Sequence, residues 1–313
     1  MTRHLRSLMD FSAADTTRVI DLAQAVKRDP AAYATKLAGK SIAMIFAKQS
    51  TRTRVSFEVG IHQLGGQALS LSTSGGTGMQ MGRGETVSDT AKVMSRFVHA
   101  IVIRTFGQDQ IDGLAEYGSI PIINALTDMF HPCQALADLL TIREHLGTTA
   151  GKKLVYVGAA NNVSNSLMLA GARAGMDVVV SSPASLPVNE QVLERASADA
   201  KAGGTTVTVD TDPMRAVVGA DVIYTDTWVS MGEEEQAKAL IAKLDGFMVT
   251  PKMMAATGKD KALFMHCLPA HRGEEVDEAV MDGKWSVVFD QAENRLHAQK
   301  AVLLLLLGGA SWT

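Results

Sequence analysis

Short apolar runs alternate along this chain with longer segments of helical pattern, and this alternation constrains the fold more than any other feature of the sequence. The run 41–46 is bounded by a glycine and a lysine, which favours a buried parallel strand. The segment 55–64 predicts a helix that ends at Gly65 and Gly66. Repeated strand–helix units favour parallel sheets covered by helices on both faces. Further predicted strands are 100–103, 121–123, 154–157, 178–180, 222–224, 263–265 and 287–289.

The length of 313 residues predicts two domains of the usual size. Each is expected to be an α/β domain, built on a doubly wound, mainly parallel sheet with helices on both faces. We place the first domain at residues 1–147 and the second at 148–294. The boundary lies in the glycine-containing segment 146–151, which separates a predicted helix from a predicted strand. A strongly apolar C-terminal helix, within residues 295–313, is expected to pack back on the first domain.

Charge and composition argue against several classes of function. The net charge of −3 provides no basic surplus for binding nucleic acid or an anionic membrane. The apolar run 301–307 is far shorter than the roughly 20 residues of a membrane helix. The first residues lack a signal-peptide core, and two cysteines do not make a disulfide framework. We therefore expect a cytoplasmic protein.

Polar residues follow the first predicted strand at the edge of the sheet where ligands bind in doubly wound folds. Ser50 suits the N-cap of the next helix, whose free backbone N–H groups and dipole favour an anion. The hydroxyls of Thr51 and Thr53 add donors, and Arg52 can hold a phosphate with two hydrogen bonds. The segment is thus interpreted either as a phosphate site or as an ordinary capped helix.

Two further predicted strands of the first domain are also followed by polar residues that can bind a ligand. Arg104 directly follows the strand 100–103, and His131 precedes Pro132 at a predicted helix start, with Gln134 in the first turn. Each residue alone also fits a structural role. Their common position after strands of one sheet predicts that they converge on one pocket.

In the second half of the chain, polar residues again follow the predicted strands. The turn that begins at Gly158 lacks the Gly-x-Gly-x-x-Gly fingerprint, which argues against a nicotinamide dinucleotide. It leads to Asn161 and Asn162, whose amides lie at a helix start. Asp226 follows another strand, where it would bind a cation or cap its loop.

The strand 263–265 leads to His266, Cys267 and His271. These residue types suggest zinc, but a single thiolate and an unrecognised spacing make zinc the weaker hypothesis. A Cys/His hydrolase is also conceivable, although no triad pattern is present.

Six segments that occur in order along nearly the whole chain resemble the signature segments of ornithine carbamoyltransferases, in the aspartate/ornithine carbamoyltransferase family. Together they are far more specific than any one of them. They are the segments 46–54, 79–85, 131–134, 226–232, 266–273 and 293–301.

The resemblance implies a carbamoyl-phosphate domain followed by an amino-acid domain. It implies transfer of the carbamoyl group of carbamoyl phosphate to the δ-amine of L-ornithine, which gives L-citrulline and phosphate in arginine metabolism. No metal or other cofactor is implied. The resemblance also implies trimers, or multiples of trimers, in which the loop around Gln80 reaches into the neighbouring subunit.

Site roles are carried over from the resemblance position by position. Arg104, His131 and Cys267 would be catalytic. The residues implied for carbamoyl phosphate are Ser50, Thr51, Arg52, Thr53, Gln80, Arg104, His131, Gln134, Cys267, Leu268 and Arg295. The residues implied for ornithine are Asn162, Asp226, Ser230 and Met231.

The chain departs from the family pattern at Ala47, where Glu is frequent, at Ala159, where Asp is usual, and at Thr86, where Pro is usual. A catalytically silent relative therefore stays an alternative. Aspartate, N-acetylornithine and putrescine are alternative acceptors. An acid at Asp226 suits the α-ammonium of ornithine, which the last two lack. The sequence leaves open the physiological direction and the size of the assembly.

Overall fold

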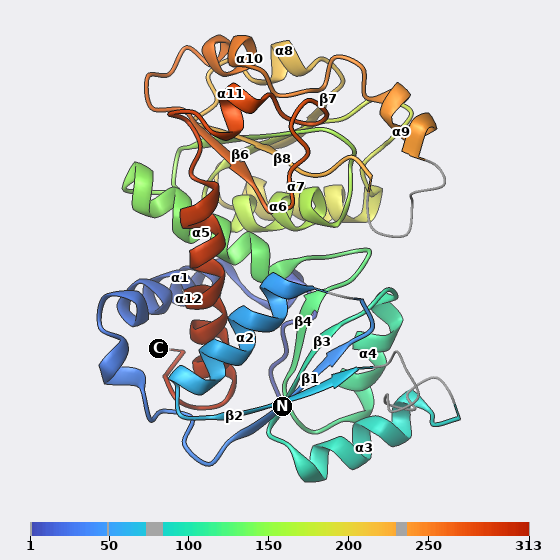
Figure 1. The fold of residues 1–313 in the computed structure, drawn as a ribbon, viewed down its shortest axis with the longest axis vertical. Coiled ribbons are helices and arrows are strands. Elements are labelled where there is room, and N and C mark those ends of the chain that lie inside the picture. The colour runs from blue at the N-terminus through green and yellow to red at the C-terminus, as the bar shows by residue number, and fades with distance from the viewer. Residues whose placement is uncertain (1, 49, 73–83, 230–236, 313) are drawn as a thin grey trace. The chain divides into compact units, whose positions relative to one another are not determined.

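The structure, a computed structural model, describes residues 2–48, 50–72, 84–229 and 237–312 (Figure 1). The chain forms two compact units. The first contains Met1–Leu140 and Asn294–Thr313, and the second contains Thr141–Glu293. Each holds a parallel sheet with helices on both faces, so the predicted α/β class is confirmed.

The first unit is built on a four-stranded parallel sheet in the order β2-β1-β3-β4. The two central strands are buried along most of their length, as their continuous apolar runs predict. The strands are β1 (Ser41–Phe46), β2 (Gln67–Ser72), β3 (Ala100–Arg104) and β4 (Ile122–Leu126).

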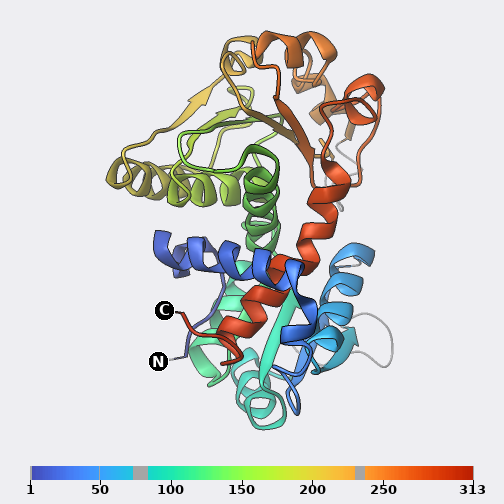
Figure 2. The same ribbon diagram turned by 90° about the vertical axis from the view of Figure 1, so that its left-hand side faces the viewer.

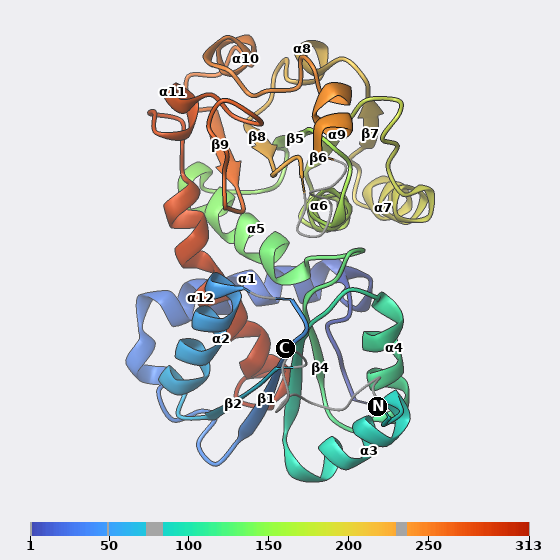
Figure 3. The ribbon, with the colours of Figure 1, turned by 45° about the vertical axis from the view of Figure 1, so that its right-hand side comes forward.

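Helices cover both faces of this sheet (Figure 3). On one face α3 and α4 pack side by side, and Ala91 and Ile111 contribute to a core with Ile101 and Ile103. On the other face Gly60 of α2 lies against Leu296 of α12. The helices are α1 (Ala13–Arg28), α2 (Thr51–Gln63), α3 (Val87–Phe97), α4 (Gln108–Tyr117), α5 (Pro132–Leu146) and α12 (Val288–Leu306), with short 3-10 helices η1 (Leu8–Asp10) and η2 (Pro30–Tyr33).

The N-terminal segment lies along the edge of this sheet. Leu5 forms a parallel bridge with Ile123, and its amide donates to the Ile122 carbonyl at 2.9 Å. The two ends of the chain lie on the same side of the first unit, where the Trp312 ring packs edge-on against Phe11 with 5.2 Å between ring centroids (Figure 2). The segment therefore covers an edge that would otherwise present unpaired backbone groups.

The second unit contains a five-stranded parallel sheet in the order β7-β6-β5-β8-β9. Figure 1 shows α6 and α7 on one face and α8, α10 and α11 on the other. The strands are β5 (Lys153–Val157), β6 (Asp177–Ser181), β7 (Val207–Asp210), β8 (Val222–Thr225) and β9 (Leu263–His266). The helices are α6 (Asn162–Arg173), α7 (Glu190–Ala202), α8 (Pro213–Ala216), α9 (Ala237–Lys243), α10 (Pro251–Ala256) and α11 (Glu278–Met281).

One predicted strand is wrong. The run 287–289 is not a strand, because Val288 begins α12, and only Ser286 forms an isolated bridge, with Phe264 of β9. A short apolar run suits a buried helix start as well as a strand, and periodicity does not distinguish the two. The last helix consequently begins before the predicted residue 295. Among the described residues, no helix combines the length and the apolar character that crossing a membrane requires.

Candidate functional site

The first candidate site lies where β1 leads into α2. The Ala47 amide donates to the Arg104 carbonyl at 2.9 Å, which extends the pairing of β1 and β3 by one bond. Ser50 is the N-cap of α2, and its Oγ accepts from the Thr53 amide at 3.3 Å. Thr51 and Arg52 are exposed on the first turn, whereas Thr53 is buried. This helix start thus presents backbone N–H groups, a hydroxyl and a guanidinium to an anion.

The guanidinium of Arg295, in the first half of α12, hydrogen-bonds to two predicted site residues. Arg295 Nη1 donates to Gln134 Oε1 at 2.7 Å, and Nη2 donates to Thr53 Oγ1 at 3.3 Å. Gln134 in turn donates from Nε2 to Asp138 Oδ1 at 2.9 Å. The first unit therefore brings together side chains from α2, α5 and α12.

Arg104 and His131 are buried at the ends of the neighbouring strands β3 and β4. Burial, followed by the positive charges of Arg295, Arg104 and Arg52, holds the pKa of His131 well below 6.5. The imidazole is therefore neutral at physiological pH. A neutral ring offers one N–H donor and adds no charge to the surrounding guanidiniums.

Cys133 lies in the first turn of α5. Its thiol is fully buried, and Sγ lies 3.4 Å from the Asn124 carbonyl. Burial raises the pKa of Cys133 to about 12. The thiol is therefore suited to packing and not to nucleophilic chemistry.

In the second unit, a buried carboxylate receives hydrogen bonds from three strand ends. Asp226, after β8, accepts from Asn161 Nδ2 at 2.9 Å and from the Cys267 thiol at 2.9 Å. The Thr227 amide also donates to it at 2.8 Å. Asn161 is the N-cap of α6 and forms a capping box with Ser164. Asp226 is therefore held by donors that follow β5, β8 and β9.

The segment after β9 has a distinctive backbone. Leu268 adopts a left-handed conformation with φ of 61°, and its amide donates to His266 Nδ1 at 2.8 Å. His266 Nε2 lies 3.3 Å from Oε1 of the fully buried Glu275. The His271 side chain is exposed, and its Nδ1 lies 3.2 Å from Thr227 Oγ1. These contacts fix the turn that presents Cys267 and Leu268.

One group of candidate metal ligands overlaps this site. Ligand atoms of Asp226, His266 and Cys267 lie within 4.8 Å of one another. However, His266 Nδ1 already accepts the Leu268 amide and Asp226 accepts three donors, so the ligand atoms have other partners.

The predicted site residues thus form two groups, one in each unit. Asn162 begins α6, directly after the N-cap residue that contacts Asp226. The predicted set omits Asn161, although it is the residue whose side chain bonds to Asp226, because its position at a helix start signals an N-cap equally well. Gln80, Ser230 and Met231 lie outside the described residues.

Two of the positions that depart from the family pattern have local structural roles. Thr86 is the N-cap of α3, and its Oγ1 accepts from the Asp89 amide at 3.1 Å. The Ala159 carbonyl accepts from the Tyr156 hydroxyl at 2.8 Å, a bond that needs no side chain at residue 159.

Comparison with known proteins gives matches along nearly the whole chain. Residues 3–144 match the aspartate/ornithine carbamoyltransferase carbamoyl-P binding domain, and residues 150–306 match the Asp/Orn binding domain of the same family. An ornithine carbamoyltransferase of Acidothermus cellulolyticus is 49% identical over 310 residues, which cover 99% of this chain and 98% of the relative. One of Symbiobacterium thermophilum is 50% identical over 307 residues, or 97% of this chain and 98% of the relative.

Solved structures give the same result. The chain superposes on ornithine carbamoyltransferase from Pyrococcus furiosus with a TM-score of 0.93 and 47% identity, over 99% of this chain and 98% of that one. It superposes on a mitochondrial ornithine carbamoyltransferase from Coccidioides immitis with a TM-score of 0.89 and 35% identity, over the full length of both chains.

Proposed function

We propose that the protein transfers the carbamoyl group of carbamoyl phosphate to the δ-amine of L-ornithine. The products are L-citrulline and phosphate. The chain belongs to the aspartate/ornithine carbamoyltransferase family, whose two domains match nearly its whole length. The observation that carries the proposal is that this chain shares 49–50% sequence identity, over nearly its full length, with relatives named ornithine carbamoyltransferase.

The phosphate end of the donor is assigned to the start of α2. Ser50, Thr51, Arg52 and Thr53 supply backbone N–H groups, hydroxyls and one guanidinium there. In the reaction the amine nitrogen forms a bond to the carbamoyl carbon and the C–O bond to phosphate breaks. The leaving phosphate keeps the electron pair and takes up the proton that the amine loses. Charge on that leaving group is neutralised by Arg52 and by the helix dipole.

The carbamoyl group is assigned to Arg104, His131, Gln134 and Arg295. Attack by the amine places negative charge on the carbonyl oxygen, and buried N–H donors stabilise such charge strongly. The neutral imidazole of His131 has one N–H to donate, and its pKa is held well below 6.5 by burial and by the neighbouring guanidiniums. The reaction changes no oxidation state, so it needs no redox cofactor.

The acceptor is assigned to the second unit. Asp226 provides the negative charge that an α-ammonium group requires, whereas aspartate would bring a second carboxylate against it. Asn162, Ser230 and Met231 are assigned to the α-carboxylate end, and Cys267 and Leu268 to the place where the two substrates meet. The δ-amine has an ordinary pKa near 10.4, so it must be bound in its neutral form to attack.

Assembly and location are part of the proposal. The protein forms trimers or multiples of trimers, in which Gln80 contributes to the site of a neighbouring subunit, and it works in the cytoplasm. Measuring the molar mass in solution tests the proposed trimer. The molar mass of a monomer would contradict it.

Citrulline release tests the activity. Purified protein is supplied with carbamoyl phosphate and ornithine, and in parallel reactions with aspartate, N-acetylornithine or putrescine. We expect turnover with ornithine and at least a hundredfold lower kcat/KM with the other acceptors. Turnover with a different acceptor but not with ornithine contradicts the substrate assignment. Binding of carbamoyl phosphate without any turnover identifies a catalytically silent relative.

A further inference from the structure

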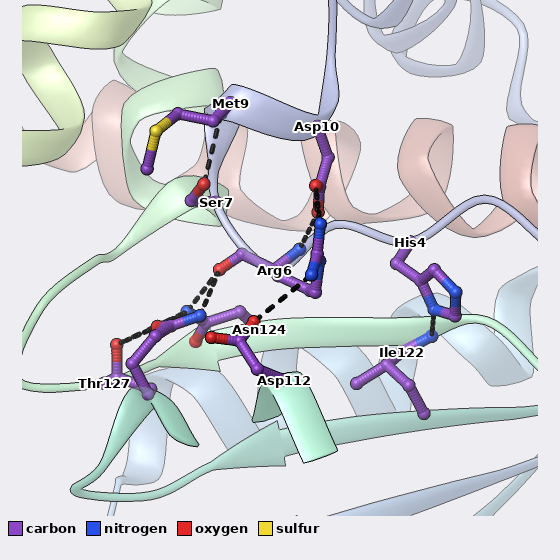
Figure 4. Close-up of polar contacts among 10 residues, drawn as sticks. His4, Arg6, Ser7, Met9, Asp10, Asp112, Ile122, Asn124 and Thr127 are labelled. Carbon is purple, nitrogen blue, oxygen red and sulfur yellow. Dashed lines mark hydrogen bonds and ion pairs between the residues drawn. The ribbon is translucent and has the colours of Figure 1, made fainter. Parts of the chain in front are cut away.

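A cluster of polar side chains lies at the end of β4, a few residues before His131 in the chain, and includes Asn124 and Thr127 (Figure 4). Asn124 and Thr127 are fully buried there. Asn124 Nδ2 donates to the Arg6 carbonyl at 2.7 Å, and Thr127 Oγ1 donates to Gln108 Oε1 at 2.9 Å. Neither buried side chain is accessible to a substrate, so any effect they have on catalysis acts through other residues.

The turn before His131 is closed by two reciprocal hydrogen bonds. The Thr127 amide donates to the Phe130 carbonyl at 2.8 Å, and the Phe130 amide donates to Thr127 Oγ1 at 3.0 Å. His131 follows directly, and its carbonyl accepts from the Gln134 amide at 3.1 Å in the first turn of α5. The backbone of His131 is therefore held between the closed turn and the helix.

Gln108 determines which way the Thr127 hydroxyl points. Its Oε1 is a nearer acceptor, at 2.9 Å, than the Phe130 carbonyl at 3.4 Å. With the hydroxyl proton directed to Gln108, the oxygen lone pairs face the Phe130 amide. The hydroxyl thus acts at once as a donor to α4 and as an acceptor from the turn.

The turn is also anchored to the edge of the sheet. The Asn124 amide donates to the Leu5 carbonyl at 2.8 Å, and its side chain bonds to the next residue of the same N-terminal segment, Arg6. The Arg6 guanidinium pairs with Asp10 at 2.6 Å. The cluster therefore links the turn to α4 through Gln108 and to the N-terminal segment through Asn124.

We propose that Thr127 is a positioning residue for His131: its hydroxyl, oriented by Gln108, closes the 127–130 turn and so sets where the imidazole meets the carbamoyl group. The proposal rests on the proposed function for the identity of the reaction. Because misplacement of a catalytic group by about 1 Å costs on the order of a hundredfold in rate, loss of one hydrogen bond in this turn has a kinetic effect.

A double-mutant cycle tests the proposal. Thr127→Val removes the hydroxyl and keeps the side-chain shape, whereas Thr127→Ser keeps the hydroxyl. We expect Thr127→Val to lower kcat/KM for carbamoyl phosphate by about 10- to 100-fold and Thr127→Ser to restore most of it. In a His131→Ala background, the further loss from Thr127→Val is expected to be less than about twofold, because coupled residues are not additive.

Binding provides a second measurement that needs no turnover. The dissociation constant of carbamoyl phosphate can be measured from the rise in Tm that the ligand causes. We expect Thr127→Val to weaken this binding in the wild-type background and to change it little in the His131→Ala background. Equal losses from Thr127→Val in the two backgrounds overturn the proposal, as does a lower Tm with unchanged kcat/KM. If the wild-type protein binds carbamoyl phosphate but releases no citrulline, the proposed function fails, and the binding cycle still decides the role of Thr127.

Discussion

The thiol of Cys267 donates a hydrogen bond to Oδ1 of Asp226 at 2.9 Å. The two residues follow neighbouring strands, β9 and β8, whose carboxyl ends lie at the same edge of the second sheet. The other carboxylate oxygen accepts from Asn161 Nδ2 at 2.9 Å. Asp226 is therefore held in one orientation by the protein itself, which under the proposed function lowers the entropy cost of recognising an ammonium group.

Asp226→Asn is expected to weaken ornithine binding far more than carbamoyl-phosphate binding, because it removes the charge and retains the shape. A hydrogen bond to a charged group contributes about 1.5–3 kcal/mol, so KM for ornithine should rise about 10- to 150-fold. Saturation curves for the two substrates measure the effect. Asp226→Glu is the comparison variant, since it keeps the negative charge and changes only the reach of the carboxylate. Equal losses for both substrates would remove Asp226 from the acceptor site.

Arg104→Ala is expected to lower kcat by about 100- to 1000-fold, the usual effect of removing one donor from an oxyanion site. The fold should survive, because the strand pairing of Arg104 with Ala47 uses its backbone carbonyl. Circular dichroism measures whether the fold survives, and initial rates measure the loss of kcat. Arg104→Lys, which retains the charge without the planar donor geometry, separates charge from hydrogen bonding. An unchanged rate in Arg104→Ala excludes the oxyanion role.

Sequence patterns identify the elements that are buried on both faces. The apolar run of β3 predicts its strand correctly, because a central parallel strand has no polar face. In contrast, β7 alternates Val207 and Val209 with polar residues, and the edge strand β2 has as many polar as apolar residues. Both are absent from the predicted strands, because their weak apolar pattern is also typical of loops.

The location of a candidate site residue can be predicted from the sequence where the residue lies at the end of a strand in a parallel sheet. Arg104, His131 and Asp226 each follow a strand, and parallel strands bring such residues to one edge of their sheet. Contacts made by long side chains are not predictable in this way. Arg295 reaches Thr53, 242 positions away in the chain, and no local pattern signals that contact. Likewise, the bond from Asn161 to Asp226 depends on the order of β5 and β8 in the sheet.

The two cysteines are expected to differ sharply in reactivity. Cys133 is fully buried with a pKa raised to about 12, so at pH 8 only about one molecule in ten thousand carries its thiolate. Cys267 is half-buried. Iodoacetamide should therefore label Cys267 and spare Cys133 in the folded protein, as mass spectrometry of peptides can measure. Labelling of both cysteines in urea is the control, and equal labelling rates in the folded state would contradict the burial of Cys133.

His131 is expected to make the free energy of unfolding depend on pH. Burial and the nearby guanidiniums lower its pKa in the folded state, whereas in the unfolded chain the pKa is near 6.5. Below about pH 6.5 the unfolded chain therefore binds a proton that the folded protein does not, and stability falls by up to about 1.4 kcal/mol per pH unit until the folded pKa is reached. Urea unfolding of the wild type and of His131→Gln at pH 7.5 and pH 5.5 measures this contribution. The variant should lose less stability than the wild type between the two pH values, because Gln does not titrate. Equal losses would show that the imidazole is protonated as readily in the folded protein as in the unfolded chain, and would remove the neutral donor from the proposed chemistry.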